Sequence, residues 1–204
     1  MTALVLMLAL AAAPPSKPDA GALPVLGGLV DVAQAVPRAV LQIHYATPNN
    51  FMHKAVYAHA RCLLRADVVA RLKKVEAQLE AQGYRLKLWD CYRPLSVQRA
   101  MWKLVPVRGL VADPNRGGSH HNRGTAVDAS LVDLKGREIA MPSPHDDFTR
   151  AGRRDAPCKD PMACTHRAVL REAMEAVGFT TIRMEWWHFD APQAGRAPLL
   201  DAPL

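Results

Sequence analysis

Two short segments of the chain carry the residue types of a hydrolytic metal centre. Residues 119–128 read SHHNRGTAVD, and residues 185–188 read EWWH. Two imidazoles and one carboxylate can fill three corners of a tetrahedron around zinc and leave the fourth open for water. A glutamate beside that water can take its proton. Together the two segments therefore predict a zinc site that hydrolyses a bond.

The prediction rests on the joint pattern, because a single His or Asp in a chain of this length is usually solvated or satisfied in the core. His121 and Asp128 flank a glycine and small residues that let the backbone approach a metal, and Glu185 stands three residues before His188. Neighbouring side chains on an extended segment diverge, so we choose His121 over His120 as the ligand. The other histidines show no ligand spacing: His44, His53, His59, His145 and His166.

The motifs resemble those of the zinc D-Ala-D-Ala peptidases of family M15, in which S-x-H-x-x-G-x-A-x-D precedes a later E-x-x-H. The EWWH segment is similar to that of the VanX-type D-Ala-D-Ala dipeptidase branch. Residues 45–51, 89–94 and 141–148 resemble that branch in the same order, so the likeness covers roughly residues 40 to 190. The departures are modest and stand at three places: Cys91, His120 and the pair Ala129 and Ser130.

The resemblance implies one zinc ion per chain as the cofactor, with Glu185 taking a proton from water and passing it to the leaving amine. Arg93 is the best candidate to stabilise the developing oxyanion, because a permanently charged guanidinium holds its partner more strongly as negative charge appears. An arginine paired with Asp90 on the surface is the alternative. The implied zinc ligands are His121, Asp128 and His188.

Two further residues are expected to bind the substrate. Asp146 aligns with the family carboxylate that receives a free substrate amine, and Asp147 is its adjacent competitor. A carboxylate at this place would pair with the ammonium group and select dipeptides over longer chains. Ser119 would hydrogen-bond the substrate carboxylate, or it only shapes the loop. The expected partner is therefore a small dipeptide.

The elements that must position these residues follow from the apolar spacing. Apolar residues recur at helical spacing over 68–79, so we expect a helix there that Asp67 caps and Gly83 ends. Alternation over 85–88 predicts a strand. Pro94 then favours the start of a new helix.

The second half of the chain repeats this alternation of short elements. The Gly-, Pro- and Asp-rich span before His121 predicts a loop that enters a strand, and a last helix over about 165–177 leads into a strand over 179–184. Residues three apart in a strand point to opposite faces, so Glu185 and His188 can share a site only if a bulge or turn intervenes. The pattern indicates an α+β fold. The resemblance implies the Hedgehog/DD-peptidase-like fold, a small antiparallel sheet flanked by helices.

The length of the chain and its first residues indicate how the domains are organised. A chain of 204 residues can bury the core of one compact domain. The apolar run Leu4–Ala12 and the Pro-rich stretch after it predict an export signal. We therefore assign residues 1–22 to a signal peptide and flexible leader, and 23–204 to the enzyme domain. The run is too short to span a bilayer, so we expect a periplasmic or secreted protein without stable membrane insertion after processing.

Four cysteines agree with export, because disulfides persist outside the cytoplasm. We expect Cys62 to pair with Cys91, tying a helix to the strand that follows it, and Cys158 to pair with Cys164 across a short loop. Zinc binding by these thiols is the rival interpretation. The sequence lacks a C-x-x-C spacing, which favours disulfides.

Charge and motifs together narrow the function. The net charge is +7, but the basic residues are scattered among acidic ones without a nucleic-acid reader motif, so no nucleic-acid partner is expected. The favoured function is hydrolysis of D-Ala-D-Ala in cell-wall precursor or turnover metabolism. A D,D-carboxypeptidase or other peptidoglycan peptidase with the same zinc site is one alternative. A non-catalytic, zinc-bound peptide-binding module is another, against which Glu185 and Arg93 argue.

Overall fold

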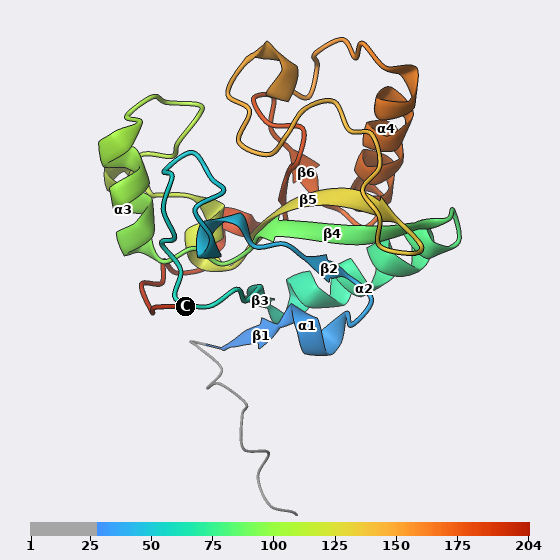
Figure 1. The fold of residues 1–204 in the computed structure, drawn as a ribbon. Helices are drawn as coiled ribbons and strands as arrows, with labels where there is room; N and C mark the ends of the chain where they lie inside the picture. Colours follow the sequence, from blue (N-terminus) through green and yellow to red (C-terminus); the bar gives the residue numbers. More distant parts are fainter. Residues whose placement is uncertain (1–27) are drawn as a thin grey trace, which may run out of the picture.

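The computed structural model describes residues 28–204, which form an α+β fold (Figure 1). The strands are β1 (Leu29–Asp31), β2 (Val40–Leu41), β3 (Leu63–Arg65), β4 (Tyr84–Asp90), β5 (Ala126–Asp133), β6 (Thr180–Thr181) and β7 (His188–Asp190). The helices are α1 (Val32–Ala35), α2 (Ala66–Glu80), α3 (Leu95–Leu104) and α4 (Pro161–Glu175). Within the described residues, no helix is long and apolar enough to cross a membrane. The predicted signal peptide and leader lie outside this range.

The main sheet has five strands in the order β2-β4-β5-β7-β6, and β1 pairs with β3 in a second sheet. The pairs β4–β5, β5–β7 and β7–β6 are antiparallel. The edge strand β2 pairs with β4 in parallel, so the sheet is mixed. Helix α2 packs against β4 and α4, and α4 also contacts β5. The β5–β7 register places Asp128 opposite His188. The sheet thereby brings two of the predicted ligands together.

The two long helices differ in how their first turns are capped. Helix α2 starts directly after Arg65, whose side chain makes no capping bond, and Asp67 lies in the first turn and not at the cap position predicted for it. Its carboxylate there still favours the positive end of the helix. Helix α4 starts earlier than expected, at Pro161, because the Asp160 carboxylate accepts a hydrogen bond from Met162 N.

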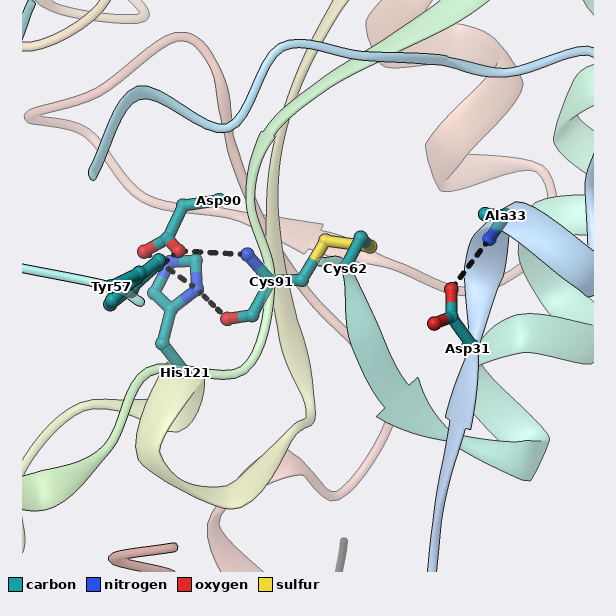
Figure 2. The surroundings of a disulfide bond; sticks show 7 residues. All are labelled: Asp31, Ala33, Tyr57, Cys62, Asp90, Cys91 and His121. Carbon is teal, nitrogen blue, oxygen red and sulfur yellow. Dashed lines mark hydrogen bonds and ion pairs between the residues drawn. A yellow bond between two sulfur atoms is a disulfide. The ribbon is translucent and has the colours of Figure 1, made fainter. Parts of the chain in front are cut away.

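The four cysteines form the two pairs expected from the sequence, Cys62 with Cys91 and Cys158 with Cys164. Figure 2 shows the first pair joining the segment before β3 to the end of β4. The backbone carbonyl of Cys91 accepts a hydrogen bond from Nδ1 of His121 at 2.7 Å. The Cys62–Cys91 pair therefore braces the segment that contacts a predicted metal ligand.

Removal of the Cys62–Cys91 bond should lower the free energy of unfolding of the metal-free protein by about 3–4 kcal/mol, because the bond spans a sequence separation of 29 residues. Urea titration of a variant with both cysteines changed to alanine measures this loss. The Cys158–Cys164 pair spans only 6 residues, and its removal should cost about 2 kcal/mol. Equal losses in the two double variants would contradict the predicted order.

Candidate metal centre

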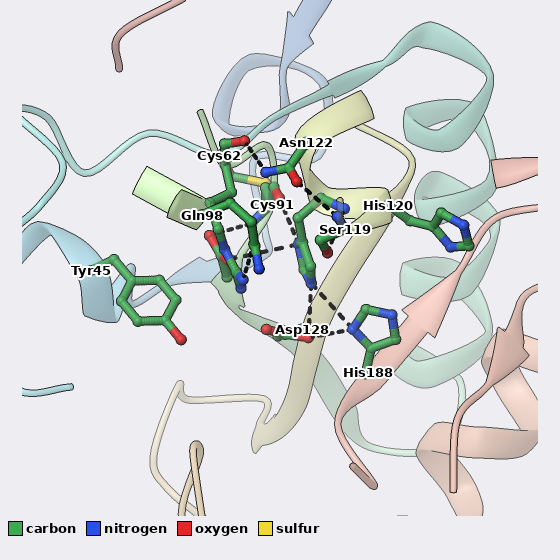
Figure 3. Close-up of polar contacts among 12 residues, drawn as sticks. Tyr45, Cys62, Cys91, Gln98, Ser119, His120, Asn122, Asp128 and His188 are labelled. Atoms are coloured by element: carbon green, nitrogen blue, oxygen red, sulfur yellow. Dashed lines mark hydrogen bonds and ion pairs between the residues drawn. A yellow bond between two sulfur atoms is a disulfide. The ribbon is translucent and has the colours of Figure 1, made fainter. Parts of the chain in front are cut away.

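Three side chains from separate elements converge at one buried point. His121 lies in the 3-10 turn η3 (His120–Arg123), Asp128 in β5, and His188 at the start of β7. Nε2 of His121 is 3.2 Å from Nδ1 of His188, and Oδ1 of Asp128 is 3.3 Å and 3.1 Å from these two atoms. In Figure 3, Asp128 and His188 point toward one another across this cluster. The structure therefore brings the three predicted ligands together.

The donor set fits a metal ion. Four ligands about 2.0–2.2 Å from zinc in a tetrahedron stand about 3.3–3.6 Å apart, close to the observed separations. Nδ1 of His121 donates to the Cys91 carbonyl, and Nε2 of His188 donates to the Asp190 carboxylate at 3.0 Å. When the two rings are neutral, their other nitrogens present lone pairs toward Oδ1 of Asp128, as metal binding requires. Three such electron-rich atoms repel one another at these distances unless a proton or a metal ion lies among them, and a divalent metal ion can bind all three at once.

The turn that carries His121 is specified by its own sequence. The Ser119 hydroxyl oxygen accepts a hydrogen bond from His121 N, while the Asn122 side chain accepts one from Ser119 N. Gly124 ends the turn at φ +67°, and a Cβ there would lie 2.6 Å from Leu29 Cδ2. Ser119 thus shapes the loop, one of its two predicted roles, and it also lines the cavity.

Glu185 reaches the same site because the chain bends before β7. The strand expected over 179–184 is limited to β6, and bends at Trp186 and Trp187 separate Glu185 from His188. Oε2 of Glu185 lies 3.7 Å from Nδ1 of His188. Burial raises the pKa of Glu185 to about 7, and a cation bound nearby would lower that pKa. The turn that the sequence required between the two residues is therefore present.

Arg93 lines the cavity while it is paired with Asp90. Its Nε and Nη2 donate to Oδ2 of Asp90 at 3.0 and 2.6 Å, and its Nη1 donates to Oε1 of Gln98 at 2.9 Å. The alternative to a catalytic role was a pair of Arg93 with Asp90 on the surface. The pair exists, but both residues are buried. A guanidinium has five N–H groups, so two remain for a substrate.

Asp146, and not Asp147, faces the cavity. Its carboxylate accepts a hydrogen bond from the Tyr45 hydroxyl, with distances of 3.0 and 3.1 Å to its two oxygens. Asp147 accepts a bond from Thr149 N within a turn. A Cβ at Gly152 would lie 1.9 Å from the Asp147 carbonyl oxygen, so this segment packs as it does only against glycine.

Two residues of the site were missed from the sequence. Asp190 accepts hydrogen bonds from His188 and from Nδ1 of His120, the latter at 2.8 Å, which accounts for His120 pointing away from the ligand cluster. Its spacing of two residues from His188 within a strand could have revealed it. His145 lies with Nε2 3.2 Å from Oδ2 of Asp128, a contact for which its position in the sequence holds no signal.

Comparison with known proteins finds similar sequences over most of the chain. The family model for D-ala-D-ala dipeptidases matches residues 26–203. A D-alanyl-D-alanine dipeptidase of Escherichia coli (strain K12) is 37% identical, over 84% of this chain and 89% of its own. Those of Enterococcus faecalis (strain ATCC 700802 / V583) and Streptomyces coelicolor (strain ATCC BAA-471 / A3(2) / M145) are 31% and 33% identical, over 71% of this chain and 82% of their own. The range matched by the family model includes every residue of the site.

Proposed function

The chain belongs to the D-Ala-D-Ala dipeptidase family of M15 peptidases, and from that membership we propose that it is a zinc-dependent enzyme that hydrolyses free D-alanyl-D-alanine to D-alanine. This activity would act on cell-wall precursors or turnover products. One observation carries the proposal. The cluster of His121, Asp128 and His188 shares a single cavity of about 270 Å³ with the partly buried carboxylate of Glu185 and the buried guanidinium of Arg93.

His121, Asp128 and His188 would hold the zinc ion, which when bound would lower the pKa of a water molecule toward 7 and polarise the scissile carbonyl. Glu185, beside His188, takes a proton from the attacking water and returns it to the leaving amine. Partial burial raises the pKa of this carboxylate and so strengthens it as a proton acceptor, while a bound cation would act in the opposite direction. A peptide-binding module without hydrolysis would need no such base.

The chain supplies hydrogen-bond donors for the rest of the dipeptide. The two remaining N–H groups of Arg93 are available to the carbonyl oxygen as it becomes negative, and the Asp90 pair holds the guanidinium in place. The Ser119 oxygen already accepts from His121 N, so its own hydroxyl hydrogen is free to donate to the substrate carboxylate.

The Asp146 carboxylate favours a free dipeptide over a longer substrate. It is 11% exposed and is held by the Tyr45 hydroxyl, a place suited to an ammonium group. A D,D-carboxypeptidase substrate carries an acylated nitrogen at this point and offers no charge to Asp146. With such a substrate the partly buried charge of Asp146 would have the Tyr45 hydroxyl but no cation to pair with, which disfavours that alternative.

The Asp146→Asn change should lower kcat/KM for free D-Ala-D-Ala by about 30-fold or more, because loss of one partner of a buried charge pair costs about 2–5 kcal/mol. It should leave the slow cleavage of N-acetyl-D-Ala-D-Ala unchanged or faster. Release of D-alanine from both compounds measures this. Asp147→Asn is the matched control and should behave as wild type. Equal losses on both compounds would refute an amine-binding role for Asp146.

We also propose that the protein is exported to the periplasm or secreted, with residues 1–22 as signal peptide and leader and 23–204 as the enzyme domain. The apolar run at the start of the chain supports this. The pairing of all four cysteines fits an oxidising compartment. An exported enzyme would meet dipeptides released by wall turnover.

A further inference from the structure

We propose that His145 is a positioning residue that fixes the orientation of the Asp128 carboxylate and thereby strengthens zinc binding. The inference rests on the proposed function, since it takes His121, Asp128 and His188 as the zinc ligands. His145 is not one of them. It acts through Asp128 and does not touch the reacting atoms.

The two oxygens of Asp128 have different partners. Oδ1 lies within 3.3 Å of the ligand nitrogens of His121 and His188, which makes it the oxygen that faces a metal. Oδ2 lies 3.2 Å from Nε2 of His145. Because a carboxylate only accepts hydrogen bonds, Nε2 of His145 donates. This bond holds Oδ2 and leaves Oδ1 free to bind the ion.

The His145 ring is itself held on its faces and at both nitrogens. Its side chain is fully buried. The ring stacks on Trp89 with a centroid distance of 4.9 Å and meets the edge of Trp187 at 5.4 Å. Its Nδ1 lies 3.0 Å from Nδ1 of His44, which is hydrogen-bond distance, so one of these two nitrogens donates and the other accepts. A donor fixed in this way holds Asp128 in one orientation, as partners of metal ligands do.

The main competing role for His145 is support of the substrate-binding carboxylate next to it in the chain. Nδ1 of His145 is 3.6 Å from Oδ2 of Asp146, longer than a hydrogen bond. Asp146 is bonded instead to the Tyr45 hydroxyl. The contacts therefore assign His145 to the metal side of the cavity, and the two roles predict different changes in zinc affinity.

The test is the zinc affinity of the full chain, measured by competition with a chromogenic chelator in the absence of substrate. His145→Phe keeps an aromatic ring between the tryptophans but removes the donor, and it should weaken zinc binding about 10–100-fold. His145→Gln puts an amide N–H near the position of Nε2 and should recover most of that loss. Unchanged affinity in His145→Phe, or no recovery in His145→Gln, would overturn the proposal.

His166→Phe is the matched control. His166 lies in α4, is also buried, and its Nδ1 donates to the Ala140 carbonyl. It should bind zinc as wild type does. If circular dichroism shows His145→Phe to be unfolded, His145→Gln is compared with His145→Asn, whose amide is one methylene shorter. Gln should then bind zinc more tightly, and equal affinities would refute the role. A protein that binds zinc but releases no D-alanine would refute the proposed function and leave this test intact.

Discussion

Glu185→Gln should lower kcat for D-Ala-D-Ala by about 10²–10⁴ while the protein still binds one zinc ion. The amide has nearly the shape of the carboxylate but cannot take a proton from water. Glu185 lies 3.7 Å from the nearest ligand nitrogen, in His188, and is not one of the three clustered ligands, so zinc should be retained. D-alanine release at saturating dipeptide, with zinc content measured on the same samples, gives both quantities.

Glu175→Gln is the control for this change, because Glu175 lies on α4 and its side chain is 46% exposed. It should leave both kcat and zinc content unchanged. Full activity of a zinc-loaded Glu185→Gln enzyme would contradict the role of Glu185 as proton acceptor. Loss of zinc together with activity would place Glu185 in the metal site instead.

Arg93→Lys is expected to lower kcat for the dipeptide by about 10²–10³, comparable to the loss of an oxyanion donor. Lysine keeps the positive charge but has a single ammonium on a flexible stem. It cannot bond Asp90 and Gln98 as the guanidinium does and still face the substrate carbonyl. Because the negative charge develops only in the transition state, kcat should fall much more than KM rises.

Arg99→Lys is the matched control on α3, where Arg99 is exposed and its Nη1 lies 3.5 Å from Oδ2 of Asp201. It should leave kcat and KM unchanged. A large rise in KM with kcat preserved in Arg93→Lys would indicate that Arg93 only binds the ground state. Wild-type kinetics in Arg93→Lys would remove Arg93 from the proposed mechanism.

The candidate ligands could be predicted from two sequence motifs and the family resemblance that they carry, and the turn that presents His121 is encoded locally. Ser119, Asn122 and Gly124 form the turn that presents His121, all within six residues. Strand β5 follows that turn and carries Asp128. The need for a bend between Glu185 and His188 also followed from strand periodicity alone, and the chain bends at both intervening tryptophans.

The parts that could not be predicted depend on contacts between distant segments. His145 meets Asp128 across 17 residues of sequence and His44 across 101, and neither separation follows a helix or strand period. The parallel pairing of β2 with β4 likewise depends on how the chain returns to the sheet, and not on a local pattern. Helix α4 starts earlier than predicted because Asp160 caps it. The prediction placed the helix start by the apolar spacing further along the chain and did not use Asp160 as a cap.

The most direct test of the account is release of D-alanine from D-Ala-D-Ala by the full chain, before and after zinc is removed with a chelator and then restored. We expect release from the free dipeptide, its loss with the metal, and its recovery when one equivalent of zinc is added. N-acetyl-D-Ala-D-Ala should be a much poorer substrate. No release from the free dipeptide by a protein with zinc bound, or full activity without metal, would contradict the proposed zinc dipeptidase.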